Sequence, residues 1–398
     1  MGLRPLVAVL VAVAGLTILG PPASAAPVNT VPPSISGTAE YASTLTAEPG
    51  TWAPAPTSYA YRWLRDGQPI KQATAPAYTP GLDDLGRRLS VEVTASDGST
   101  TETAVSAPTA PVARAELRAK GGQKVAGEAR FTRTLEARAG RWSAKPSRIR
   151  YQWLRAGRPI AGATSRRHPV AVEDVGRRLR VEITVRAPGY RTLTVRTDPT
   201  ERVRHRVDAR RTVRFHVETR GRITTSLKEF VRQAQETFDD PRGWRGAGIV
   251  FKRVAKGGAM TLVLSEASRV PAFSSGCSSQ WSCRVGRFVI INQERWKHAS
   301  PAWIAANGAL RGYRHMVVNH ESGHFLGLGH AGCPGAGRPA PVMMQQSKGL
   351  NGCRFNPWPT ARELASRTPG PGRAMAYAAA AGYSRPVELT VEHTVVVD

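Results

Sequence analysis

Cysteine is scarce in this sequence and is confined to one part of it. The 398 residues contain four cysteines, all in the last third: Cys277, Cys283, Cys333 and Cys353. No inter-sheet disulfide can therefore form in a β-domain that precedes them. In an exported chain, an even count predicts two disulfides, with three possible pairings. The local pairs Cys277–Cys283 and Cys333–Cys353 are favoured, because loops of that size close easily.

Long apolar runs are also lacking beyond the N-terminus. Arg4 precedes an apolar run of 14 residues, from Leu6 to Leu19, and Ala23-Ser24-Ala25 follows as a small-residue cleavage site. This pattern predicts a signal peptide over residues 1–25, a secreted protein, and no transmembrane segment after cleavage. An uncleaved anchor is the alternative, although 14 residues are short for a membrane span. No cysteine lies near the cleavage site, which excludes a lipoprotein anchor.

Acidic residues are few and the positive charge is unevenly placed. The chain has 29 Asp and Glu against 56 Lys and Arg, a net charge of +27. Residues 27–113 carry a net −3, whereas residues 114–214 carry +18, nearly all of it from Arg. Behind a signal peptide this favours an anionic cell-envelope polymer or membrane surface as partner, and not nucleic acid. A generally Arg-rich proteome is the alternative explanation.

An internal repeat organises the first half of the chain. Three segments recur at an offset of 90 residues without a gap: 50–52 as 140–142, 61–67 as 151–157, and 86–89 as 176–179. Residues 89–95 and 179–185 alternate apolar and polar, as strands with one buried face do. Short strands in about 90 residues are typical of a small β-sandwich. The sequence therefore predicts two all-β domains, over 27–113 and 114–205.

The tandem resembles the cysteine-free immunoglobulin-like repeats of exported bacterial surface proteins. The resemblance is carried by the Trp-Leu-x-x-Gly and Gly-Arg-Arg-Leu segments of both copies. We expect the tryptophans to be core anchors, with ligand platforms as the alternative. The resemblance implies a fold and says little about a ligand.

A different pattern begins near Arg210. Strand-like alternation over 212–218 precedes a helix with a capping-box start at Ser226 and Glu229. Further strands are expected over 249–254, 260–264 and 288–292, and a helix over 312–326. This order predicts an α+β domain over residues 207–368. The tail, residues 369–398, has no functional interpretation.

The candidate site lies in the last expected helix. His320 and His324 are four residues apart and share a helix face, so both imidazoles can bind one Zn2+. Gly327 can end the helix and turn the chain, which lets His330 reach the same ion as a third ligand. Glu321, next to the first ligand, can reach a water on the metal as a general base. Three protein ligands leave an open position, as in catalytic zinc sites.

A structural zinc site is the alternative for the same histidines. It would need a fourth protein ligand, and Cys333 is the obvious candidate because it follows His330 by three residues. The favoured disulfide of Cys333 with Cys353 argues against this.

The spacing of His320, Glu321, His324, Gly327 and His330, followed by a methionine, resembles the metzincin signature. More narrowly, residues 210–365 resemble a domain of uncharacterised function in exported actinobacterial proteins that is classed as metzincin-like. The resemblance implies an α+β metzincin-like zinc metallopeptidase domain, a protein or peptide substrate, and a methionine turn beneath the zinc. Met343 is the expected methionine of that turn, with Met344 as the alternate.

Two details of the expected mechanism stay open. Several metzincins have a tyrosine after the methionine that assists the oxyanion, but this chain has none between Tyr313 and Tyr377. His315 and Arg354 are weak candidates for the same role. Residues 288–292 are either an edge strand that pairs with an extended substrate or an interior strand.

The sequence as a whole thus predicts a multidomain chain of two immunoglobulin-like sandwiches and a catalytic domain. The predicted function is that of a secreted zinc metalloendopeptidase with Glu321 as general base. A non-enzymatic cell-envelope binding protein with a structural zinc site is the alternative.

Overall fold

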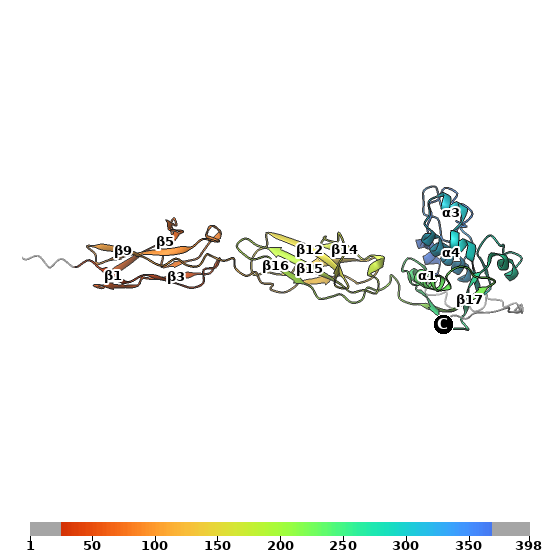
Figure 1. Ribbon diagram of the computed structural model, residues 1–398, viewed down its shortest axis with the longest axis horizontal. Helices are drawn as coiled ribbons and strands as arrows, with labels where there is room; N and C mark the ends of the chain where they lie inside the picture. The colour runs from red at the N-terminus through yellow and green to blue at the C-terminus, as the bar shows by residue number, and fades with distance from the viewer. Residues whose placement is uncertain (1–24, 368–398) are drawn as a thin grey trace, which may run out of the picture. The chain divides into compact units, whose positions relative to one another are not determined.

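The computed structural model describes residues 25–367, and Figure 1 shows the elements in chain order. Nearly all of the expected signal peptide and the whole tail 369–398 lie outside the described residues. Among residues 25–367, no helix has the length and apolar character needed to cross a bilayer.

The first repeat forms three small antiparallel sheets around one core. Their orders are β1-β4, β2-β3-β7 and β6-β5-β8-β9. Trp63 in the core is fully buried, stacks on Tyr78, and donates from Nε1 to the carbonyl of Ala75 at 2.9 Å. The strands are β1 (Val28–Val31), β2 (Ser34–Ser36), β3 (Leu45–Glu48), β4 (Thr51–Ala53), β5 (Ser58–Arg65), β6 (Gln68–Pro69), β7 (Ala77–Tyr78), β8 (Leu89–Ser96) and β9 (Thr101–Val105).

The second repeat has two sheets, with orders β10-β11-β14 and β13-β12-β15-β16. Trp153 is fully buried at the position of Trp63, which confirms both as core anchors. The alternation of residues 179–185 is confirmed too, because Leu179, Val181, Ile183 and Val185 are all buried. The strands are β10 (Lys124–Ala126), β11 (Thr134–Arg138), β12 (Arg148–Arg155), β13 (Arg158–Pro159), β14 (Arg167–Pro169), β15 (Leu179–Arg186) and β16 (Leu193–Arg196).

Each repeat also buries one carboxylate at the same position. Asp84, in the short helix η1 (Leu82–Asp84), accepts from Arg65 Nε at 2.7 Å and from the hydroxyl of Tyr78 at 2.8 Å. Asp174 is its counterpart, in η2 (Val172–Asp174). It contacts Arg155 Nε at 2.7 Å and His168 Nε2 at 2.8 Å. The repeat therefore conserves a buried ion pair but exchanges a phenol for an imidazole.

The last region has a five-stranded sheet with helices packed on it. The strand order is β18-β17-β19-β21-β20, with parallel pairing from β18 through β21 and antiparallel pairing of β20 with β21. The strands are β17 (Arg211–Arg220), β18 (Ile249–Arg253), β19 (Met260–Ser265), β20 (Cys283–Val285) and β21 (Phe288–Asn292). The α-helices are α1 (Leu227–Asp239), α2 (Gln293–His298), α3 (Pro301–Ala305), α4 (Leu310–Phe325) and α5 (Ala361–Ser366). Two short helices, η3 (Trp244–Ala247) and η4 (Ala267–Phe273), complete the region.

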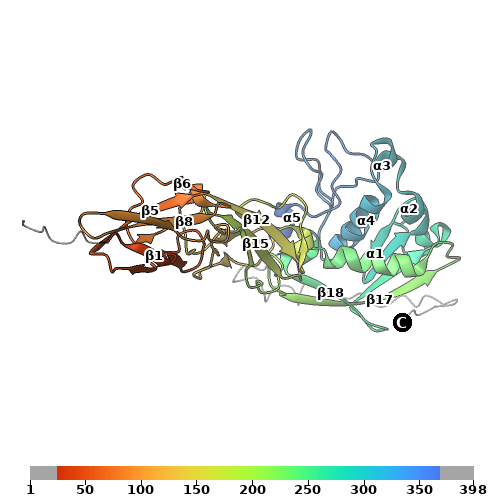
Figure 2. The same ribbon diagram turned by 60° about the vertical axis from the view of Figure 1, so that its left-hand side comes forward.

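Helix α1 begins as the sequence predicts and links two parallel strands. The hydroxyl oxygen of Ser226 accepts from the backbone N–H of Glu229, which satisfies one free donor of the first turn. Phe230, Ala234 and Phe238 are buried from this helix. Because α1 connects β17 to the parallel strand β18, the three form a β-α-β arrangement, visible in Figure 2.

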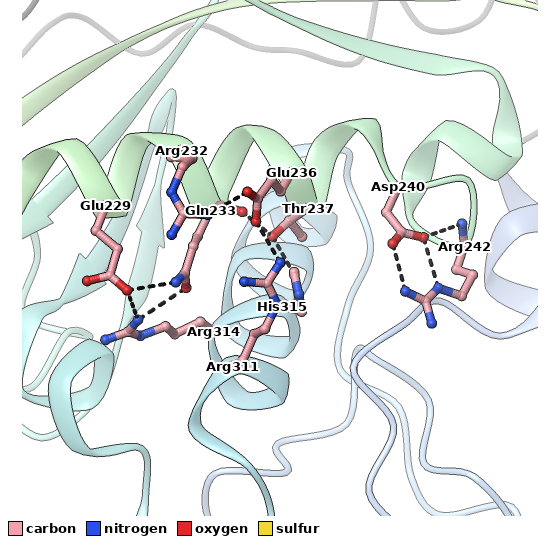
Figure 3. A network of polar contacts seen from close by, with 10 residues as sticks. All are labelled: Glu229, Arg232, Gln233, Glu236, Thr237, Asp240, Arg242, Arg311, Arg314 and His315. Atoms are coloured by element: carbon pink, nitrogen blue, oxygen red, sulfur yellow. Dashed lines mark hydrogen bonds and ion pairs between the residues drawn. The ribbon is translucent and has the colours of Figure 1, made fainter. Parts of the chain in front are cut away.

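A polar network holds α4 against α1, as Figure 3 shows. Arg314, almost fully buried, donates from Nη1 to Glu229 Oε1 at 2.8 Å and to Gln233 Oε1 at 3.2 Å. One turn away, Thr237 Oγ1 and His315 Nδ1 lie 2.9 Å apart. These contacts fix the rotation of α4 about its axis, and that rotation decides which residues of α4 face the opposite side.

The fold prediction for the whole chain is wrong in one respect. Strands take up 33% and helices 18% of the structure, so the chain is mostly β. In an α+β domain, helices are segregated from an antiparallel sheet. The last region differs, because α1 joins the parallel strands β17 and β18. The expected α+β metzincin-like domain is therefore corrected to a mixed, largely parallel sheet in a mostly β chain.

The structure decides between the two alternatives for residues 288–292. Residues 288–292 form β21, which pairs with β19 on one side and with β20 on the other, so this strand is interior. The edge beside it is β20, residues Cys283–Val285. Three residues give too short an alternation for periodicity to identify a strand.

Candidate metal centre

Helix α4 carries two of the three histidines and ends where the sequence predicts a turn. His320 and His324 lie one turn apart on it, and Glu321 lies between them. Gly327 has a φ of +88°, and the N–H of Leu328 donates to the carbonyl of Gly323 at 3.0 Å. This is the bonding of a Schellman motif, in which glycine is favoured at the left-handed position. The turn brings His330 back toward the helix.

The three imidazoles converge on one point. Nε2 of His324 lies 3.1 Å from Nε2 of His320 and 3.2 Å from Nε2 of His330. Three ligands of a tetrahedral zinc ion, each about 2.05 Å from the metal, lie roughly 3.3 Å apart. The spacing of the nitrogens thus fits one small cation. Among residues 25–367, these three histidines are the group whose ligand atoms lie close enough to hold a metal ion.

The hydrogen bonds of the other ring nitrogens fix the tautomers. Nδ1 of His320 donates to the carbonyl of Val342 at 2.8 Å, and Nδ1 of His324 donates to the carbonyl of Leu328 at 2.8 Å. A carbonyl only accepts, so Nδ1 carries the proton and Nε2 of each neutral ring presents a lone pair. Burial lowers the pKa of His320 to about 3, which keeps that ring neutral. Facing lone pairs at this distance repel one another unless a cation lies between them.

Glu321 is buried beside the cluster, and its carboxylate forms no hydrogen bond or ion pair with residues 25–367. Only 5% of it is exposed, and it lines the same cleft as the three histidines. Burial raises the pKa of Glu321 to about 8, while the positive charge of Arg284 acts in the opposite direction. A carboxyl group in that position can take up and return a proton near neutral pH.

Met343 and Met344 lie on different sides of the segment that follows the histidines. Met343 is buried under α4, where its sulfur fills the space that a side chain at Gly323 would need. Met344 packs with Ala340 and the Cys333–Cys353 disulfide, and it also lines the cleft. Of the two methionines, Met343 is therefore the one that packs against α4.

A buried carboxylate on α5 holds this segment in place. Glu363 accepts from the backbone N–H of Met343 at 2.9 Å and from that of Val342 at 3.2 Å. It also accepts from the N–H of Thr360 at 2.7 Å, within a capping box. Because the carbonyl of Val342 accepts from His320, Glu363 orients a candidate metal ligand through one peptide group.

Both favoured disulfides are confirmed. Cys277 is bonded to Cys283 and Cys333 to Cys353. Cys333 is thereby unavailable as a fourth ligand of the histidine cluster. The first disulfide closes a loop at the rim of the cleft, where Cys277 and Cys283 are both lining residues.

Other predicted residues lie elsewhere. His315 faces α1, and its ring packs at a tilt against Trp358 with the centroids 4.8 Å apart, away from the cleft. Arg354 is exposed in a bridge with Pro339 and is not a lining residue. Sequence reasoning missed Arg284 and Lys348, which do line the cleft, and the role of Glu363. The capping box of Thr360 and Glu363 is visible in the sequence, but it predicts only a helix start.

Residues 187–357 match a family described as a protein of unknown function, DUF3152. No curated protein matches the chain. The matched family has no stated activity and no metallopeptidase family matches, so the metzincin-like assignment is corrected: the findings support only a similarity of residues 187–357 to the DUF3152 domain of unknown function.

Similar solved structures are all-β domains of the immunoglobulin and fibronectin type. One is the three N-terminal domains of the outer capsid protein Hoc of bacteriophage RB49, with 17% identity, a TM-score of 0.22, and coverage of 48% of this chain and 66% of that one. A D1–D4 ectodomain fragment of ICAM-5 has 12% identity and a TM-score of 0.25, with coverage of 42% and 52%. A two-domain fibronectin type III segment of chicken tenascin has 13% identity and a TM-score of 0.20, with coverage of 42% and 99%. The chain thus spans less than two thirds of the first two proteins.

Proposed function

We propose that this protein is a secreted zinc-dependent peptidase in which His320, His324 and His330 hold the ion and Glu321 is the general base. The observation that carries the proposal is the convergence of three Nε2 atoms beside a buried carboxylate in one cleft. Imidazole nitrogens are favoured ligands of zinc, and three of them leave a coordination position open.

When bound, the ion would supply Lewis acidity, which polarises a carbonyl and lowers the pKa of a water molecule toward neutrality. The residues of the chain do the rest. Val342 and Leu328 hold the rings of His320 and His324 in the tautomer that presents Nε2. Glu321 takes the proton of the attacking water at its carboxylate and returns it to the leaving amine. Its burial keeps competing solvent away from that carboxylate.

Peptides are the proposed substrates because a sheet edge lies beside the cleft. Strand β20 pairs only with β21 in its sheet, and Cys283 and Arg284 of β20 line the cleft. An extended peptide can pair with such an edge through backbone hydrogen bonds, which do not depend on the side chains of the peptide. The scissile bond would then lie near the histidine cluster.

A structural zinc site has less support. It is usually closed by a fourth protein ligand. The cluster among residues 25–367 has three members, and Cys333 is in a disulfide. Export is supported by the two disulfides, which form and persist in oxidising compartments.

Cleavage of a diverse peptide library by the full chain tests the proposal. The protein is loaded with one equivalent of Zn2+, and mass spectrometry identifies new termini. We expect cleavage that a chelator abolishes and that added Zn2+ restores. A zinc-loaded protein that leaves every peptide intact would exclude the peptidase.

A further inference from the structure

Arg284 brings a positive charge to the cleft from the edge strand. Its neighbour Val285 packs on the opposite side of the sheet, in a cluster with Val263 and Ile290. Because side chains alternate along a strand, Arg284 faces α4. There its Nη2 donates to the carbonyl of His324 at 2.5 Å. One contact uses one of five guanidinium N–H groups, so donors remain for a ligand.

Lys348 brings a second positive charge from a separate segment. The segment is tied to α4 by the contact of 2.9 Å between the hydroxyls of Tyr313 and Ser347. A turn places Lys348, whose N–H donates to the carbonyl of Gln345 at 2.9 Å. Its side chain is exposed and lines the same cleft as Arg284. The backbone of the residue is therefore fixed while its ammonium group stays accessible.

The charge of the cleft is not balanced. Among residues 25–367, neither Arg284 nor Lys348 forms an ion pair, and Glu321 is the one acidic residue that lines the cleft. Arg284 contacts the carbonyl of His324, and Lys348 lines the cleft from the segment that follows Met344. Both cations line the same cleft as the histidine cluster, and a metal ion would add to its positive charge.

We propose that Arg284 and Lys348 form a binding site for a carboxylate, so that the cleft selects peptides with a carboxylate close to the bond that is cleaved. The selection of cleaved bonds rests on the proposed function, but the binding of the carboxylate does not. Guanidinium and ammonium groups both bind carboxylates with charge-assisted hydrogen bonds. The carboxylate belongs either to an acidic side chain or to a free C-terminus.

Peptide binding to the metal-free full chain tests the site without turnover. Fluorescence anisotropy compares three labelled peptides of one sequence: an acidic side chain with an amidated C-terminus, a neutral side chain with a free C-terminus, and a neutral side chain with an amidated C-terminus. We expect one of the first two to bind about fivefold more tightly than the third, which corresponds to one partly exposed charge pair. Equal binding of all three peptides overturns the proposal.

Matched variants separate the site from general attraction to a basic protein. Lys348→Gln should remove most of the preference and Lys348→Glu should reverse it. Arg284→Lys should retain more of it than Arg284→Gln. The control is Lys252→Gln, which removes the same charge from an exposed position outside the cleft. If Lys252→Gln weakens binding as much as Lys348→Gln, the preference comes from net charge and the site is excluded.

Cleavage of the same peptides by the zinc-loaded chain distinguishes the two proposals. Cleavage without preference for a carboxylate overturns the inference and leaves the peptidase. A carboxylate preference in binding, together with no cleavage, leaves the site and excludes the peptidase. Faster cleavage of the carboxylate-bearing peptide, lost in Lys348→Glu, supports both.

Discussion

Nδ1 of His320 donates a hydrogen bond of 2.8 Å to the backbone carbonyl of Val342. The same residue donates its own N–H to Glu363, which also accepts from Met343. The candidate metal ligand is therefore oriented by a buried carboxylate that is 43 residues away in sequence and never touches the imidazole. Residues that hold a metal ligand in place through hydrogen bonds affect the affinity of the site for the metal.

Glu363→Gln should weaken zinc binding without removing a ligand. The amide keeps the volume of the side chain but replaces one acceptor oxygen with a donor, which opposes an N–H of Val342 or Met343. We expect the affinity for Zn2+ to fall about tenfold. Competition with a chromogenic chelator measures it. Glu236→Gln, which removes only surface ion pairs, is the control and should leave affinity unchanged.

Gly323→Ala should destabilise the last region, although alanine is the better helix former. Its Cβ would collide with the sulfur of Met343 and lie 2.9 Å from Cζ2 of Trp244. We expect a loss of about 2 kcal/mol in the free energy of unfolding, as for an overpacked core. Urea denaturation followed by tryptophan fluorescence measures it. Gly329→Ala, where a Cβ meets nothing within 4 Å, is the control. Equal stability of both variants would contradict the packing of Met343 under α4.

The second repeat should lose stability in acid through Asp174. Burial alone would raise the pKa of this carboxyl, but the hydrogen bonds from His168, from the N–H of Ala171 and from Arg155 outweigh it, so the pKa is lowered. A lowered folded-state pKa means that the contribution is present above about pH 4, the unfolded value, and is lost as pH falls through the folded value.

Hydrogen exchange resolved by peptide tests this contribution. At pH 7, Asp174→Asn should lower the free energy of opening of amides in β12 and β15 by about 2 kcal/mol, because the donors that now bind the carboxylate would lose its negative charge. Acid should then reduce protection less in the variant than in the wild type. Strands β5 and β8 of the first repeat are the internal reference. An unchanged acid response in the variant would assign the pH dependence to another group.

Removal of one histidine of the cluster should abolish stoichiometric zinc binding. His330→Ala leaves two imidazoles, and two ligands do not hold the ion in a catalytic site. We expect the bound zinc, measured by mass spectrometry of the native protein, to fall from one ion per chain to none at micromolar metal. His298→Ala removes an exposed histidine on α2 and should retain one ion per chain. Retention of zinc in His330→Ala would show that this histidine is not a ligand.

Local patterns in the sequence predict much of this structure. The N-cap at Ser226, the left-handed Gly327 and the convergence of His330 with His320 and His324 all depend on neighbouring residues, so spacing reveals them. The two disulfides follow from short loops in the same way. The predicted domain boundaries, the signal peptide and the envelope polymer partner stay predictions.

Relationships across the fold were not predictable from spacing. Strand β20 is three residues long, and its position at the sheet edge depends on pairing with β21. Arg284 and Lys348 are 64 residues apart and line one cleft only because both segments border α4. The metzincin-like assignment failed for a related reason: a short motif of five fixed positions describes a site and does not determine the surrounding family or fold.

Glu321→Gln tests the central claim most directly, with zinc content and peptide cleavage measured on the same sample. The amide keeps the shape of the side chain but cannot accept the proton of the attacking water. We expect one zinc ion per chain in both proteins, and cleavage that falls at least about a hundredfold in the variant, as for loss of a general base. Full zinc loading with unchanged cleavage in Glu321→Gln would contradict the account.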